Sequence, residues 1–231
     1  MPLSARVQDA PVNVEAVRGP VYYLHGFASS PESTKARRFA DHLAARGITL
    51  VTPDLNAPEF TTLTMSRMLE QLTESIAYAD GRVTLIGSSL GAALAILAAS
   101  QMKTAVDRLI LLAPAVMLAK PGHSLLPPDR IAEWQRRGTA PFFHYGYNEE
   151  RLLNVAFYDD SLRHDPFEAE FTQPTLIFQG LRDNVVDHHS TELFARSRPN
   201  VTLHLLDDDH QLTASLPLMW PAVDAFLGLA A

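Results

Sequence analysis

The chain contains no cysteine, and this absence excludes several kinds of chemistry. Disulfide bonds, thiolate metal sites and a cysteine nucleophile cannot occur. A protein without cysteine is compatible with a reducing cytosol. The segment from Met1 to Val17 also lacks the basic start and apolar core of a signal peptide. We therefore expect a cytoplasmic protein.

Long apolar runs and basic clusters are also missing. The longest apolar run, Leu90 to Ala99, is shorter than the ~18 residues that a membrane span requires. The formal net charge is −7 and no Lys/Arg-rich run occurs, which disfavours a nucleic acid as partner. We expect no membrane and no nucleic acid among the partners, while the oligomeric state stays open.

The chain of 231 residues is long enough for one domain with its own core. Short apolar runs recur along it, and continuous runs of this kind are typical of parallel strands buried on both faces. The runs are Val21–Leu24, Ile48–Val51, Val83–Ile86, Leu109–Leu112, Thr175–Phe178 and Val201–Leu206.

Helical patterns separate these runs. Ala36, Phe39, Ala40 and Leu43 have helical spacing, and Leu90–Ala99 is apolar on all sides, as a buried helix should be. A last helix is expected over Pro217–Leu227. The alternation predicts an α/β fold with a mostly parallel, doubly wound central sheet and helices on both faces.

The alternation stops between Pro114 and Pro174, a stretch too long for a plain connection. We expect a helical cap insertion at 115–173 within a single domain spanning 1–231. Short helices are predicted near Asp129–Arg136 and Glu149–Ala156. The insertion is rich in aromatic residues, which suggest an apolar pocket, although core packing explains many of them equally well.

One motif points to covalent catalysis. Gly87-Ser88-Ser89-Leu90-Gly91 matches G-x-S-x-G and lies after an apolar strand and before a buried helix, the context of a nucleophile elbow. The sharp turn exposes the Ser89 hydroxyl, while Gly87 and Gly91 leave room for the chain. The free N–H groups and positive end of the helix face the same place. Taken alone, the motif is a modest signal, and an ordinary Gly/Ser turn is the alternative, but the strand before it and the helix after it favour the elbow.

A serine hydroxyl requires a base, and the expected chain order is serine, acid, histidine. His210 follows the last strand, and Asp183 follows the strand before it. Asp183 would fix the His210 ring so that its other nitrogen faces Ser89. Asp187 and the run Asp207–Asp209 are competing acids, of which the run is expected to be a solvated turn.

His25-Gly26-Phe27 follows the first strand and suggests an oxyanion hole. In this arrangement the backbone N–H of Leu90 is one donor and that of Phe27 is the expected second donor. His25 is expected to brace the loop and not to transfer protons. An ordinary turn at His25-Gly26 is the alternative.

Six other histidines are not expected to bind metal. His188 and His189 could form a metal pair, but adjacent side chains should point apart, and a helix cap near Asp187 is the preferred interpretation. The insertion histidines are expected on the surface or in a lid, and they are His123, His144 and His164. His204 lies within a predicted strand and is expected to be structural.

Together these motifs resemble the alpha/beta-hydrolase family. The run from His25 to Pro31, with Lys35-Ala36 and the Gly-Ser-Ser-Leu-Gly elbow, more narrowly resembles small bacterial YqiA-type serine esterases. The resemblance implies hydrolysis of a small-molecule ester through an acyl-enzyme, with no metal and no organic cofactor. The insertion is longer than this subgroup suggests.

The sequence therefore predicts a serine carboxylic-ester hydrolase acting on a small, apolar acyl or aryl ester. Thioesters, peptides and carbon–carbon bonds are alternative substrates for the same three residues, and fold does not choose among them. A dehalogenase is disfavoured, because it requires a carboxylate in place of Ser89. A third hypothesis is a non-catalytic module that binds ligands on the same fold.

Overall fold

A computed structural model describes residues 16–118, 120, 122–123 and 126–229, so most of the segment from Met1 to Val17 lies outside the described residues. Its centre is a six-stranded sheet in the order β2-β1-β3-β4-β7-β8, and every pairing is parallel. The predicted fold class is confirmed. The strands are β1 Val21–Leu24, β2 Leu50–Val51, β3 Val83–Ser88, β4 Val106–Leu112, β7 Thr175–Gly180 and β8 Val201–Leu206.

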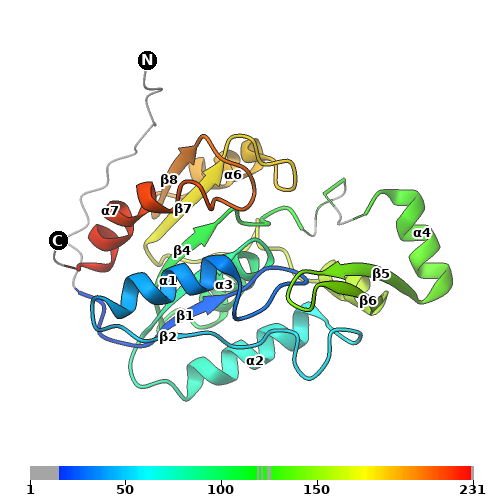
Figure 1. Cartoon of the computed structure of the whole chain (residues 1–231), viewed down its shortest axis with the longest axis horizontal. Coiled ribbons are helices and arrows are strands. Elements are labelled where there is room, and N and C mark those ends of the chain that lie inside the picture. The colour runs from blue at the N-terminus through cyan, green and yellow to red at the C-terminus, as the bar shows by residue number, and fades with distance from the viewer. Residues whose placement is uncertain (1–15, 119, 121, 124–125, 230–231) are drawn as a thin grey trace.

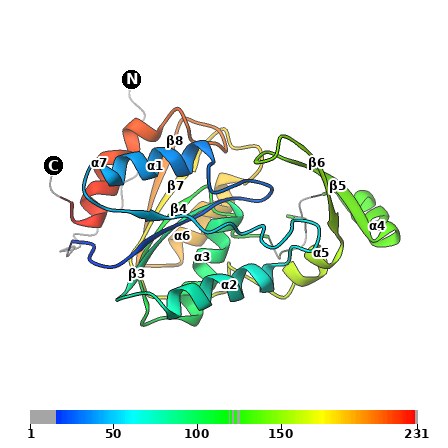
Figure 2. The same ribbon diagram turned by 60° about the horizontal axis from the view of Figure 1, so that its bottom comes forward.

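Helices cover both faces of the sheet (Figures 1 and 2). The first face carries α1 (Thr34–Ala44) and α7 (Leu216–Leu227), and their apolar side chains form one core cluster. The second face carries α2 (Met65–Ala77), α3 (Leu90–Gln101) and α6 (His188–Arg196), which share a larger cluster. No helix within the described ranges is long and apolar enough to cross a membrane.

The strand order creates a switch point at the carboxyl edge of the sheet. From β1 the chain passes outward to β2, then returns across β1 to form β3 and continues to β4. In open α/β sheets, ligands bind where the strand order reverses in this way. The loop after β1 and the turn after β3 therefore lie at the place where a site is expected.

The insertion between β4 and β7 combines helices with a β-hairpin. It contains α4 (Pro128–Arg137), the antiparallel strands β5 (Thr139–His144) and β6 (Glu149–Asn154), and α5 (Ala156–Ser161). The predicted helix near Asp129–Arg136 is confirmed. Figures 1 and 2 show α4 and the hairpin extending to one side of the sheet.

The prediction of a helix over Glu149–Ala156 is wrong, because this segment forms β6 and α5 begins only at Ala156. The charged residues of the segment are compatible with a helix, but pairing with β5 overrides that local preference. The backbone of Asn148 has φ 55°, a left-handed conformation that reverses the chain before β6. Leu153 is thereby fully buried, and its carbonyl accepts from Trp134 Nε1 at 2.9 Å.

Several predicted pocket aromatics pack into the core between the insertion and the sheet. The Phe27 ring contacts Phe60, Phe142 and Phe157, with ring centroids 5.6, 5.2 and 5.3 Å away. Phe157 and Trp134 are each only 1% exposed. The insertion is therefore anchored on the loop after β1 by aromatic packing.

Candidate active site

Ser89 lies on the turn between β3 and α3. Its backbone has φ 53° and ψ −112°, a combination that side-chain-bearing residues rarely adopt. Ser89 is the N-cap of α3, yet its hydroxyl makes no capping hydrogen bond. The turn thus holds a strained serine whose side chain is not used by the helix, as a nucleophile elbow requires.

The two glycines of the motif allow close backbone approach. A Cβ atom on Gly87 would lie 2.5 Å from Ala92 Cα, and one on Gly91 would lie 2.1 Å from the Leu24 carbonyl oxygen. Neither site can accept a larger residue without movement of the backbone. The motif is therefore fixed sterically, with α3 pressed against β3 and β1.

Ser89 is also close to the loop after β1. A Cβ on Gly26 would lie 3.5 Å from Ser89 Cβ. The Ser89 N–H donates to the Leu112 carbonyl at 2.9 Å, and its carbonyl accepts from Ala115 N–H at 3.2 Å. Three strand ends, those of β1, β3 and β4, thus meet around this residue.

The structure brings Asp183 and His210 together. His210 Nδ1 lies 2.8 Å from Asp183 Oδ2, and their side chains are 13% and 0% exposed. Asp183 Oδ1 accepts from Val185 N–H and Val186 N–H, each at 2.8 Å. Burial raises the pKa of Asp183, but the hydrogen bonds from His210 and these amides outweigh it and hold the pKa below its usual value.

The hydrogen bond to Asp183 has a consequence for the His210 ring. An ionised carboxylate can only accept, so His210 Nδ1 carries the proton. In the neutral ring this leaves Nε2 as an acceptor. Among the described residues no hydrogen bond joins the Ser89 hydroxyl to His210. Such contacts are often longer without substrate.

The two expected oxyanion donors have unused backbone N–H groups. Neither Phe27 N–H nor Leu90 N–H donates to another described residue. Leu90 is the first residue of α3, where N–H groups have no partner within the helix. Two free donors next to Ser89 are compatible with an oxyanion hole.

His25 connects two loops. It is 3% exposed, and its Nε2 accepts from Leu55 N–H at 3.1 Å, which requires the proton to be on Nδ1. Nδ1 then donates to the Gly26 carbonyl at 2.9 Å. Because both ring nitrogens are engaged, His25 braces the loop after β1, as the sequence suggests.

The competing acids have other roles. Asp187 is the N-cap of α6 and accepts from His189 N–H at 3.1 Å, in agreement with the predicted cap. The expectation of a solvated turn is wrong for Asp208, which is 4% exposed and accepts from Asp209 N–H and Ser215 N–H. Asp208 therefore shapes the loop that carries His210.

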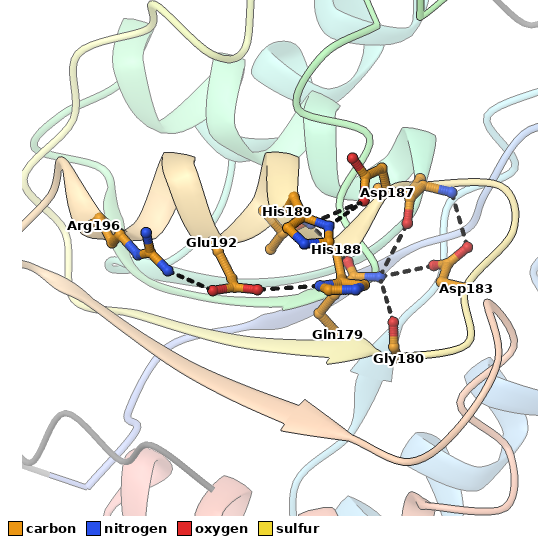
Figure 3. Close-up of polar contacts among 10 residues, drawn as sticks. Gln179, Gly180, Asp183, Asp187, His188, His189, Glu192 and Arg196 are labelled. Atoms are coloured by element: carbon orange, nitrogen blue, oxygen red, sulfur yellow. Dashed lines mark hydrogen bonds and ion pairs between the residues drawn. The ribbon is translucent and has the colours of Figure 1, made fainter.

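The His188 and His189 rings do not point apart as expected, but stack with centroids 4.0 Å apart. Their nitrogens and an Asp187 oxygen lie within 4.8 Å of one another. Figure 3 shows that these groups already have partners: His188 Nδ1 contacts Glu192 at 3.1 Å, and His189 Nδ1 contacts Asp187 at 3.0 Å. We therefore assign them a structural role.

The four other histidines considered in the sequence fall in different environments. His123 is exposed, whereas His144 is fully buried within the insertion, so of the two expected places, surface or lid, the surface is wrong for His144. His164 Nε2 lies 2.8 Å from Ser66 Oγ. His204 lies in β8 and packs on Phe178 with centroids 5.2 Å apart, as expected for a structural residue.

Sequence reasoning assigned no role to two buried polar residues near Asp183 and His210. Lys35 is 7% exposed, and its Nζ donates to the His210 carbonyl at 3.4 Å. Gln179 is fully buried, and its Nε2 donates to Asp183 Oδ2 at 2.9 Å. The available signals were a lysine within a helical apolar pattern and a glutamine at the end of an apolar strand.

A model of the Uncharacterised protein family UPF0227 matches residues 21–227. No curated protein matches the chain.

Solved structures match over nearly the whole chain. Est1E from Butyrivibrio proteoclasticus with bound ferulic acid has a TM-score of 0.78 and 21% identity, covering 97% of this chain and 93% of that one. Mouse alpha/beta hydrolase domain-containing protein 10 has a TM-score of 0.74 and 20% identity, and the match covers 97% of this chain and 98% of that one. A structure from work on the metagenome-derived lipolytic enzymes LipS and LipT has a TM-score of 0.71 and 22% identity, and the match covers 92% of this chain and 95% of that one. The chain has the alpha/beta-hydrolase fold.

Proposed function

Because the chain belongs to the YqiA-like family UPF0227 and has the alpha/beta-hydrolase fold, we propose that it is a serine carboxylic-ester hydrolase. The resemblance found in the sequence is thus confirmed at the level of the family. The observation that carries the proposal is the 2.8 Å contact between His210 and Asp183, at the same sheet edge as the strained Ser89 turn.

In the proposed reaction, His210 Nε2 takes the Ser89 hydroxyl proton as the oxygen attacks the ester carbonyl. Asp183 holds the ring and stabilises its positive charge. The protonated ring then gives the proton to the leaving alcohol, and the acyl group remains on Ser89. A water molecule, activated by the same ring, releases the acid and restores the serine.

The Phe27 and Leu90 N–H groups would bind the negative oxygen that develops in both steps. Each such donor contributes roughly 3 kcal/mol of transition-state stabilisation. The donors are not used within the described structure, so no internal hydrogen bond has to break when substrate enters. Because Phe27 lies in the loop after β1 and Leu90 is the first residue of α3, the site depends on the packing of α3 against β1.

The surroundings of Phe27 support a proposal for the substrate class. Its ring, one residue after Gly26, belongs to an aromatic cluster with Phe60, Phe142 and Phe157. We propose a small ester with an apolar acyl or aryl group. Est1E, which has the same fold, binds ferulic acid, an aryl acid, in its solved structure.

Hydrolysis of p-nitrophenyl acetate by purified protein tests the proposal. Ser89→Ala should abolish turnover, and the neighbouring Ser88→Ala is the matched control that should retain it. Turnover by Ser89→Ala at the wild-type rate would contradict the assignment. Acyl-thioesters and aminoacyl amides assayed in parallel separate the alternative substrates of the same residues.

A fluorophosphonate probe separates an enzyme from a non-catalytic binding module. The wild-type protein should be labelled covalently at Ser89, as peptide mass spectrometry would show. Folded protein that stays unlabelled and inactive would support the binding module instead.

A further inference from the structure

Asp183 is held by a second side chain besides His210. Gln179, in β7, is fully buried, and its Nε2 lies 2.9 Å from Asp183 Oδ2. The same oxygen lies 2.8 Å from His210 Nδ1. Figure 3 shows the glutamine amide directed at Asp183 from the end of the strand. Two donors, one from β7 and one from the loop after β8, therefore converge on one carboxylate oxygen.

The amide of Gln179 has only one workable orientation. Its Oε1 accepts from Thr191 Oγ1 of α6 at 3.0 Å, and Thr191 is fully buried. Its Nε2 also lies 3.3 Å from the carbonyl oxygens of Gly180 and Val186. A rotated amide would present Oε1 to a carboxylate and two carbonyls, none of which can donate. Thr191 and these acceptors therefore fix the amide.

We propose that Gln179 and Thr191 are positioning residues, which orient the Asp183 carboxylate so that His210 is held towards Ser89. The proposal rests on the proposed function, since it assigns the acid of that mechanism a support. The Val185 and Val186 amides hold only Oδ1. Gln179 fixes Oδ2, the oxygen that His210 uses.

This support has an electrostatic as well as a geometric effect. A neutral amide donor stabilises the ionised form of a buried carboxylate without adding charge. Asp183 then stays ionised while His210 becomes positive during the reaction. Loss of the donor would leave Asp183 with fewer hydrogen bonds in a buried site, and His210 would be the one side chain among the described residues still holding Oδ2.

A purely structural role makes a different prediction. Gln179 could serve only to satisfy the carbonyls of Gly180 and Val186. Its loss would then lower the unfolding free energy, but the pH profile of the folded enzyme would be unchanged. The pH profile and the split between kcat and KM therefore separate the two roles.

The first test uses Gln179→Met and Gln179→Glu in the full chain, with p-nitrophenyl acetate as substrate. Gln179→Met should lower kcat by about 10- to 100-fold, the loss expected for a misplaced catalytic group. KM should stay near the wild-type value. Gln179→Glu places two carboxylates together, so one retains a proton and the acid limb of the pH profile should move by about 1 unit or more to higher pH.

Thr191 supplies a matched pair of variants. Thr191→Val has the same shape without the hydroxyl and should lower kcat by about 3- to 10-fold, because the amide is no longer fixed. Thr191→Ser keeps the hydroxyl and should restore a rate close to the wild type. If Gln179→Met does not fold, equal kcat values for Thr191→Val and Thr191→Ser would overturn the proposal.

Proton NMR of the His210 Nδ1 hydrogen gives a readout that does not depend on turnover. Its downfield resonance should shift or broaden in Gln179→Met and Thr191→Val and stay in place in Thr191→Ser. If the wild-type protein is inactive but the resonance still shifts in Gln179→Met and Thr191→Val, the proposed function is rejected and the positioning of Asp183 is retained. Folded Gln179→Met with wild-type kcat, pH profile and resonance would reject the positioning role.

Discussion

The Nζ atom of Lys35 lies 3.4 Å from the backbone carbonyl oxygen of His210. This contact links α1 to the loop that carries His210. One carbonyl replaces only part of the hydration that a buried ammonium loses. Burial therefore lowers the pKa of Lys35 to about 8, although the charges of Asp183 and the acidic residues beside His210 oppose this shift.

The sign of this shift sets a first prediction. Between about pH 8 and the ordinary lysine pKa of 10.5, Lys35 of the unfolded chain holds a proton that Lys35 of the folded chain has lost. The unfolding free energy of the wild type should therefore rise with pH through this window. Below it, the folded state bears the penalty of a buried charge.

Lys35→Met removes that charge at similar length. We expect its unfolding free energy at neutral pH to exceed that of the wild type by about 1 to 3 kcal/mol, from about 1.4 kcal/mol per unit of pKa. The difference should narrow as the pH rises towards 10.5. Urea denaturation at neutral and alkaline pH measures it, with Lys35→Arg as the charged control. A less stable Lys35→Met at neutral pH would contradict the argument.

Lys35 also illustrates the limits of the sequence. The strands and the Ser89 turn could be predicted, because continuous apolar runs and the G-x-S-x-G motif are local patterns with a direct steric cause. The contacts of Lys35 and Gln179 depend on loops distant in sequence, and Lys35 lies 175 residues from His210. The strand Glu149–Asn154 was missed for a similar reason, since its partner strand and not its own residues decides its conformation.

The strained backbone of Ser89 leads to a second prediction. At φ 53° and ψ −112° a side chain is strained, whereas glycine adopts such values freely. Ser89→Gly should therefore raise the unfolding free energy by about 1 kcal/mol. This value is the backbone strain that is relieved, minus the extra conformational entropy that glycine loses on folding. Ser89→Ala keeps the strain and should have wild-type stability.

Both Ser89 variants lack the hydroxyl and should lack esterase activity. A difference between their unfolding free energies therefore reports on the backbone strain and not on the loss of the hydroxyl. Thermal denaturation followed by circular dichroism would measure the difference. If Ser89→Gly were less stable than Ser89→Ala, the turn would not store strain at this residue. Stability gained at the expense of activity is the expected result for a strained nucleophile.

A third prediction concerns His144, at the end of β5. The ring is fully buried, Nδ1 accepts from Tyr147 N–H at 3.3 Å, and Nε2 has no hydrogen-bond partner among the described residues. Burial lowers the pKa of His144, and the nearby His25 and Arg151 lower it further, while Asp54 opposes them. The same hairpin is tied to the loop after β1, because Tyr145 N–H donates to the Ala28 carbonyl at 2.7 Å.

Because the pKa of His144 is lowered in the folded chain, the unfolded chain takes up a proton below about pH 6.5 more readily than the folded chain does. The unfolding free energy of the wild type should therefore fall as the pH drops through this region. His144→Asn keeps an acceptor for Tyr147 N–H but cannot titrate, so its acid-side loss should be smaller. Fluorescence of Trp134, which hydrogen-bonds to β6, would follow the hairpin during acid titration. His123→Asn alters an exposed ring and should retain the wild-type acid slope. Equal slopes for His144→Asn and the wild type would show that protonation of this ring does not loosen the insertion.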